Sequence, residues 1–192
     1  DAEFTLNGGS IANNINKQGM GGGVATEAYY PEKRGGVFVM NGGTITGNLA
    51  QCGGGVYSYS NDVYLLAGAI AQNEATSLGG GAYVSIQGRS IHLGDGTVIM
   101  GNDATVMGGG VWSCPTGTVV LAEDQAAVFD NTAQGAGDAV AALYKTTGIE
   151  TTVNTYVLGG GVATWYQDGA TFTNVLNNSE LGSVDENAPR YM

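Results

Sequence analysis

The sequence predicts an all-β protein, a single-stranded parallel β-helix of about five coils. The first observation is a phrase of three glycines and a small apolar residue, which recurs after 32, 26 and 29 residues and then, in degraded form, after 27 more. The copies are residues 21–24, 53–56, 79–82 and 108–111, followed by the degraded 135–137. A repeat of this length is typical of a solenoid, in which each unit buries its apolar face only against its neighbours.

The second observation is three short alternating stretches within each unit. In one unit they are residues 38–40, 44–46 and 56–59, and they are rich in β-branched and aromatic residues. Alternation with period 2 predicts strands, and the Gly and Asn clusters between the stretches predict corners with positive φ. Three strands in 26–29 residues fit one coil of a β-helix, whereas a propeller blade needs about 40 residues or more.

The third observation is that equivalent positions form columns down the repeat. Alternation predicts that three columns of apolar side chains point inward. The first is Val24, Val56, Ala82 and Val111; the second is Phe4, Phe38, Tyr64, Ile91 and Val119, with Leu6, Met40, Leu66, Leu93 and Leu121 two residues on; the third is Ile11, Ile45, Ile70, Val98 and Val128.

Asparagine recurs at one corner of every unit. The positions are Asn14, Asn48, Asn73, Asn102 and Asn131. Stacked Asn side chains can hydrogen-bond from one coil to the next and satisfy backbone groups at a corner. We therefore predict a structural ladder here.

Composition excludes several classes of partner. The net charge is −11, and the only base between residues 41 and 144 is Arg89, so the basic surface that binds nucleic acids is absent. No run of 18 apolar residues exists, so we expect no membrane insertion by this segment. The scarcity of Lys and the low pI favour an extracellular or cell-surface location. Because the first residues lie almost within a repeat, we expect the chain to be part of a longer protein.

Two tetrads in the early units resemble a known pattern. They resemble the FxxN and GGA(I/L/V) tetrads of chlamydial polymorphic outer membrane proteins. The first copy is FTLN at residues 4–7 followed by GGSI at 8–11, and the second is FVMN at 38–41 followed by GGTI at 42–45. The same phrases are similar to repeats of large adhesin-like surface proteins of gut anaerobes. The resemblance covers about residues 4–143 and implies a right-handed parallel β-helix with a binding or scaffold role. The tetrads fade downstream, and the barrel of the chlamydial family has no counterpart.

The last third of the chain departs from the repeat. We assign residues 1–178 to the β-helix, with regular coils over 4–143 and an atypical last coil or cap over 144–178. The pair Asp168-Gly169 is a hairpin turn signal within this cap. Residues 179–192 are charged and are expected to form a tail or linker.

Catalytic groups do not gather in the sequence. The one histidine, His92, is aligned with Thr5, Val39, Leu65 and Val120, which predicts an exposed, unpaired side chain. An acid pair across adjacent coils, drawn from Asp95, Asp103, Asp124 and Asp130, stays open as a means of cutting a glycosidic bond. A calcium ion at a corner also stays open, although the nonapeptide repeat that binds calcium is absent. We expect no catalytic residue, metal site or cofactor.

The two cysteines are expected not to pair. Cys52 and Cys114 lie two coils apart, or about 9–10 Å along the axis at about 4.8 Å per coil. A disulfide needs Cα atoms within about 7 Å. We therefore predict that Cys52 is not bonded to Cys114.

An aromatic column is the strongest candidate site. Tyr57, Tyr83 and Trp112 each follow an inward residue, so alternation turns them outward, and Tyr59 widens the column. Exposed rings suit a glycan or a host or neighbouring protein surface. The leading interpretation is a non-catalytic adhesin-type module of a bacterial surface protein. Two alternatives stay open, a polysaccharide-active enzyme (lyase or glycoside hydrolase) and a spacer whose rings only stack on one another or lie under a loop.

Overall fold

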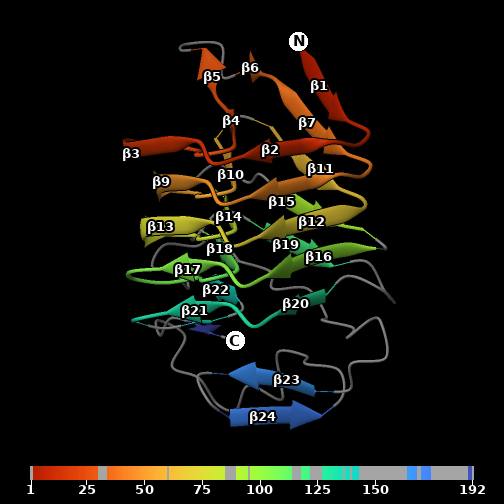
Figure 1. Cartoon of the computed structure of the whole chain (residues 1–192). Helices are drawn as coiled ribbons and strands as arrows, with labels where there is room; N and C mark the ends of the chain where they lie inside the picture. The colour runs from red at the N-terminus through yellow and green to blue at the C-terminus, as the bar shows by residue number, and fades with distance from the viewer. Residues whose placement is uncertain are drawn as a thin grey trace, which may run out of the picture.

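The fold is a stack of parallel β-coils, as the repeat predicts. The computed structural model describes residues 2–29, 34–59, 61–84, 90–94, 96–113, 118–121, 127–135, 137–138, 140–142, 164–167, 170–173 and 190–191. Every regular element in these ranges is a strand, and the coils follow one another down a single axis (Figure 1). The all-β parallel solenoid predicted from the sequence is confirmed.

Four parallel sheets run along the stack. The first contains β1 (Glu3–Leu6), β7 (Val37–Met40), β11 (Val63–Leu65), β15 (Ser90–Leu93) and β19 (Thr118–Leu121). The second contains β2 (Ser10–Ala12), β8 (Thr44–Thr46), β12 (Gly68–Ala71), β16 (Thr97–Met100) and β20 (Ala127–Phe129). The third contains β3 (Ile15–Met20), β9 (Leu49–Cys52), β13 (Glu74–Leu78), β17 (Asp103–Ala104) and β21 (Thr132–Ala133). The fourth contains β4 (Val24–Thr26), β10 (Val56–Ser58), β14 (Ala82–Val84), β18 (Val111–Ser113) and β22 (Val140–Ala142).

Three antiparallel pairings complete the described strands. A short ribbon joins β5 (Ala28–Tyr29) to β6 (Arg34–Gly35), and β25 (Arg190–Tyr191) adds antiparallel to β22. The hairpin of β23 (Thr164–Gln167) and β24 (Ala170–Thr173) confirms the turn signal of the last third.

Each coil has four strands, so the prediction of three was wrong. The missing strand is that of the third sheet, for example Leu49–Cys52, which lies between the Asn corner and the glycine triplet. Its sequence carries small and polar residues, such as the buried Ala50, Ala75 and Ala104, and the alternation of hydrophobicity is therefore weak. Tertiary pairing with neighbouring coils makes it a strand.

The inward columns form one continuous core. The column of Val56, Ala82 and Val111 is in register and fully buried, as predicted. Two other columns were misaligned by one residue in a single coil each. Val63 and Leu65, rather than Tyr64 and Leu66, continue the column below Phe38 and Met40.

The second misalignment concerns the third column. Ile99, rather than Val98, pairs with Ile70 and is buried, because coil four has one more residue at the corner between its first two strands.

The predicted asparagine ladder is confirmed, and it satisfies its own side chains. In each interior coil, the Asn Oδ1 accepts hydrogen bonds from the backbone N–H and the Nδ2 of the preceding coil's Asn. The Nδ2 donates to the next Asn Oδ1 and to a carbonyl of the preceding coil. For Asn73 these partners are Asn48, Asn102 and Ile45.

The residue before each ladder asparagine adopts a left-handed conformation. These residues are Asn13, Gly47, Gln72, Gly101 and Asp130, with φ between 51° and 63°. The prediction of positive φ at the corners is therefore correct, and two coils use glycine there because it carries no Cβ penalty.

The glycine triplets exist because adjacent coils approach too closely for a Cβ. A Cβ built on Gly55 would lie 2.5 Å from the carbonyl oxygen of Gly81, and one on Gly54 would lie 2.4 Å from that of Glu74. The chain thus turns a tight corner between the third and fourth sheets, and this corner positions the aromatic column described next.

Candidate functional site

The aromatic residues occupy one column on the outer side of the fourth sheet. Register pairs Tyr57 with Tyr83 and Tyr83 with Trp112, as the sequence predicts. The column ends at Ala25 in the first coil. At the other end the register pairs Trp112 with Ala141.

The rings form a continuous stack of four. Ring centroids are 6.4 Å apart for Tyr59 and Tyr57, 5.0 Å for Tyr57 and Tyr83, and 4.5 Å for Tyr83 and Trp112, with interplanar angles of 13°, 27° and 19°. The separations of 5.0 and 4.5 Å follow the spacing of adjacent strands, whereas Tyr59 belongs to the same coil as Tyr57 and follows β10. The stack forms a platform in which Tyr57, Tyr83 and Trp112 are held by strands in register.

Most of this platform is covered, contrary to the prediction of an exposed strip. Only 6% of Tyr57 and 4% of Trp112 are exposed, Tyr83 is half-buried, and Tyr59 is 37% exposed. Trp112 packs in a small cluster with Leu78, Tyr83 and Met107, separate from the main core.

The glycine corner explains this burial. Gly79 and Gly108 have positive φ, and a Cβ on either would come within 3.0 Å of the Cβ of Tyr83 or Trp112. The chain therefore folds back sharply, and the end of the third sheet, with Leu78, lies beside the outer face of the fourth. Alternation predicted the correct face, but it could not predict that the corner covers that face.

Trp112 keeps one unused hydrogen-bond donor. Its indole Nε1 is buried, and no group in the described part of the chain accepts a hydrogen bond from it. Tyr57 and Tyr83 both have interactions beyond the ring stack. The indole N–H is therefore a buried donor that can still bind an oxygen acceptor.

His92 has neighbours that the sequence alignment missed. Register places it beside Tyr64 rather than Leu65, and the two rings stack with centroids 4.6 Å apart. His92 Nε2 lies 4.0 Å from Asp62 Oδ2, and Asp62 Oδ1 accepts a hydrogen bond from the backbone N–H of Ser90. The prediction of an unpaired histidine was wrong, because it rested on the one-residue misalignment of β11.

Two of the four candidate acids, Asp103 and Asp130, lie among the described residues. Asp103 accepts a hydrogen bond from the Thr132 hydroxyl, and its partner in the preceding coil is Glu74. Asp130 is an exposed corner residue with positive φ. Asp95 and Asp124 lie outside the described residues. Among the residues that are described, no group of three or more His, Cys, Asp or Glu side chains could hold a metal ion.

Cys52 is a buried free thiol in the third sheet. Burial raises the pKa of this thiol above its ordinary value, and hydrogen bonds with the Leu78 backbone and the Ser77 side chain partly oppose that shift. Its partners in register are Met20 and Leu78. Cys114 lies outside the described residues, so the absence of a bond between the two cysteines stays a prediction.

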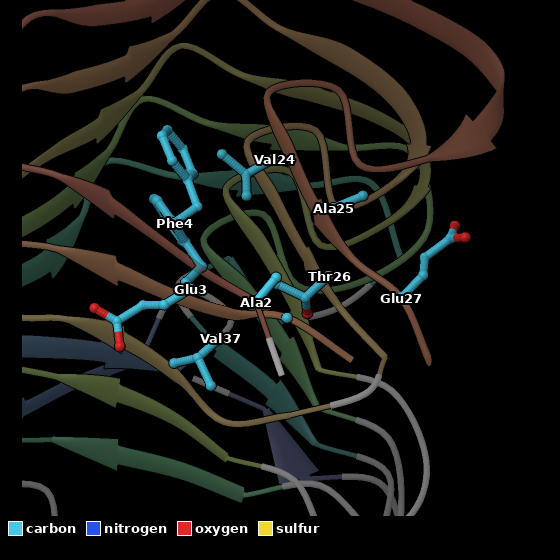
Figure 2. A pocket seen from close by; sticks show the side chains of 10 residues that line it. Ala2, Glu3, Phe4, Val24, Ala25, Thr26, Glu27 and Val37 are labelled. Atoms are coloured by element: carbon cyan, nitrogen blue, oxygen red, sulfur yellow. The ribbon is translucent and has the colours of Figure 1, made fainter. Parts of the chain in front are cut away.

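A pocket of about 270 Å³ opens at the N-terminal end of the stack (Figure 2), and Ala25, which ends the aromatic column beside Tyr57, is one of the residues that line it. Its walls come from β1, β4, β7 and the residues beside them, and they combine apolar side chains such as Phe4, Val24 and Val37 with polar ones such as Thr26. The carboxylates of Glu3 and Glu27 point away from these apolar side chains on opposite sides of the view. The pocket is thus the open end of the core.

Comparisons with known proteins add no relative. A scan against protein families finds no match, and searches of the curated proteins and of the solved structures find none either. In the part of the chain that is described, no helix is long and apolar enough to span a membrane.

Proposed function

We propose that this chain is a non-catalytic, extracellular adhesin-type module that presents a lateral surface to a glycan or a protein segment. The observation that carries the proposal is the four-ring stack, in which Tyr59 is exposed and Tyr83 is half-buried. Tyrosine rings bind sugars and peptides well, because they offer a large contact area at a small cost in conformational entropy.

The surroundings of the stack support binding rather than catalysis. The indole N–H of Trp112 is a donor without an acceptor in the described structure, and a ligand oxygen that reached it would gain a hydrogen bond in a dry site. A ligand reaches this group only after Leu78 or Met107 moves, since both pack on the indole. The two described acids that pair in register, Glu74 and Asp103, lie in the third sheet, whereas Tyr57, Tyr83 and Trp112 lie in the fourth.

The experiment is a screen of the purified chain on glycan and peptide arrays, followed by calorimetric titration of the best ligand. We expect Tyr59→Ala to weaken binding about 10-fold, or about 1.4 kcal/mol. Trp112→Phe keeps an aromatic ring but removes the N–H, and it tests whether the ligand uses that donor. Leu66→Ala is the matched control, because Leu66 is also exposed but follows the first sheet. A ligand that binds Tyr59→Ala as tightly as the parent would refute this site.

A further inference from the structure

A polar cluster lies on the outer face of the first sheet, a different sheet from the one that carries most of the four-ring stack. Its members are Asp62, Tyr64, Ser90 and His92, which belong to the neighbouring strands β11 and β15 or, for Asp62, directly precede β11 (Figure 1). The residues that alternate with Tyr64, Ser90 and His92 along these strands are buried, so these three side chains point outward. The first sheet thus presents a group of polar side chains on its outer face.

Contacts within the polar cluster hold its groups in place. Tyr64 and His92 pair in register, and their rings stack with centroids 4.6 Å apart and an interplanar angle of 10°. Asp62 Oδ1 accepts a hydrogen bond from the backbone N–H of Ser90, which fixes the carboxylate beside the rings. The His92 side chain is 32% exposed and that of Asp62 is 36% exposed, so a ligand can reach both.

The free oxygen of Asp62 and the facing nitrogen of His92 are separated by a gap that one hydroxyl group fits. Asp62 Oδ2 lies 4.0 Å from His92 Nε2, whereas a hydrogen bond between them would need about 2.7–3.2 Å. The carboxylate oxygen is an acceptor, and the nitrogen that faces it is a donor when it carries the ring proton. A hydroxyl oxygen about 2.8 Å from both atoms would see them at an angle of about 90°, which suits one accepted and one donated hydrogen bond.

Other ligands fit this gap less well. Zinc bonds to nitrogen and oxygen are about 2.0–2.2 Å long, so a zinc ion bound to both atoms at their present separation would have an angle of about 140–150° instead of a tetrahedral one. An ammonium group has only donors, so it can pair with Asp62 Oδ2 but not with a donating His92 Nε2. An anion is repelled by the Asp62 carboxylate and by the net charge of −11.

We infer that the polar cluster is a saccharide-binding site, in which hydroxyl groups of a pyranose ring bind Asp62 and His92. The hydroxyls of Tyr64 and Ser90 lie on the same face and can each donate and accept a hydrogen bond, so further sugar hydroxyls find partners there. Val39, which pairs with Tyr64 in register and is half-buried, offers an apolar surface to the sugar C–H groups. This inference does not depend on the four-ring stack.

The test uses the fact that His92 is the one histidine of the sequence, so its imidazole C–H signals in an NMR spectrum need no assignment. The full chain is titrated at constant pH with methyl α-mannopyranoside, methyl β-glucopyranoside and methyl β-galactopyranoside. Each is added to about 100 mM, which is at least about 10 times the Kd of about 1–10 mM that we expect for a shallow site. We expect at least one glycoside to shift the His92 signals with saturation. Zinc ion alone and acetamide, a peptide-group probe, are titrated in parallel.

Two variants remove the binding atoms while they keep the local structure. Asp62→Asn retains the oxygen that accepts from the Ser90 N–H but lacks the charge, and we expect it to bind the glycoside at least about 10-fold more weakly. His92→Phe keeps a ring to stack on Tyr64 but lacks the donor, and the same loss is expected there from the backbone amide shifts of β11 and β15. Met100→Ala, an exposed residue of the second sheet, is the matched control and should bind as the parent does.

Three results overturn the inference. The first is that none of the three glycosides shifts the His92 signals. The second is that Asp62→Asn and His92→Phe bind the glycoside as tightly as the parent. The third is that only zinc or only acetamide produces the shift, since a metal ion or a peptide group would then be the ligand.

Discussion

Replacing Asn73 with alanine removes the centre of the ladder. The Asn73 side chain is 1% exposed and takes part in four hydrogen bonds of 2.9–3.0 Å. Alanine leaves two buried donors of Asn48 without a partner, the backbone N–H and one of the amide N–H groups, and removes a hydrogen bond to the carbonyl of Ile45. A buried group that loses its partner costs about 1–3 kcal/mol, so we expect a loss of about 2–6 kcal/mol in the free energy of unfolding. This is a large share of the stability of a typical domain.

Asn14→Ala is the matched control at the open end of the same ladder. Its side chain is exposed and donates a single hydrogen bond, to Asn48 Oδ1, which keeps the donor from the Asn14 backbone. We expect this substitution to cost about 1 kcal/mol or less.

The assay is urea unfolding of both variants and the parent, followed by circular dichroism. Because a solenoid can unfold coil by coil, hydrogen exchange in β8 and β16 reports the local loss independently. The reasoning is refuted if Asn73→Ala costs no more than Asn14→Ala, since the ladder would then contribute no more in the interior than at its end.

Three further predictions concern single positions. Gly81→Ala should lower the unfolding free energy by about 3 kcal/mol or more, because its Cβ would lie 2.5 Å from a carbonyl oxygen of the next coil. The control is Gly8→Ala, whose Cβ would have no atom within 4 Å, and it should change the unfolding free energy by less than about 0.5 kcal/mol in the same urea titration. Gln72→Gly should raise the melting temperature and Gly101→Ala should lower it, each by an amount equivalent to about 1 kcal/mol, because both residues have a left-handed φ. If the backbone of the corner relaxed to another φ in the variants, neither melting temperature would shift in this way. Because burial raises the pKa of Cys52 in the folded state, the unfolded chain loses the thiol proton at a lower pH than the folded chain does. The parent should therefore lose stability as pH rises above the ordinary thiol pKa of about 8.5. Denaturation measured from about pH 7 to 10 should not show that loss for Cys52→Ala.

The burial of Trp112 also changes what its removal does. An exposed ring, as strand alternation predicts here, could be truncated without loss of folding. With 4% exposure and contacts to Leu78 and Met107, Trp112→Ala should destabilise the fold by about 3 kcal/mol or more by leaving a cavity. Trp112→Phe is therefore the better probe of binding, and a melting curve of Trp112→Ala that matched the parent's would contradict the packing.

The repeat in the sequence was sufficient to predict the solenoid, the inward valines and the asparagine ladder. A period of 26–32 residues requires that equivalent residues stack, and alternation with period 2 decides which of them face inward. Asn48, Asn73 and Asn102 recur where a polar side chain can bond to its own kind one coil away. Such columns depend on residue spacing alone, and they were predicted correctly from it.

Tertiary structure decided what spacing leaves undetermined. The register of a single coil depends on how many residues its corner contains, and the one-residue misalignments at Tyr64 and Val98 hid the contact between Tyr64 and His92. The strand of the third sheet, which the sequence did not predict, is held by pairing with its neighbours in adjacent coils rather than by its own propensity. The cover over Trp112 arises where the glycine corner brings the third sheet beside the fourth, a contact between residues whose sequence pattern carries no sign of it. Alternation fixes the face of a strand on which a side chain lies, but only the packing of the whole coil fixes whether that face meets water.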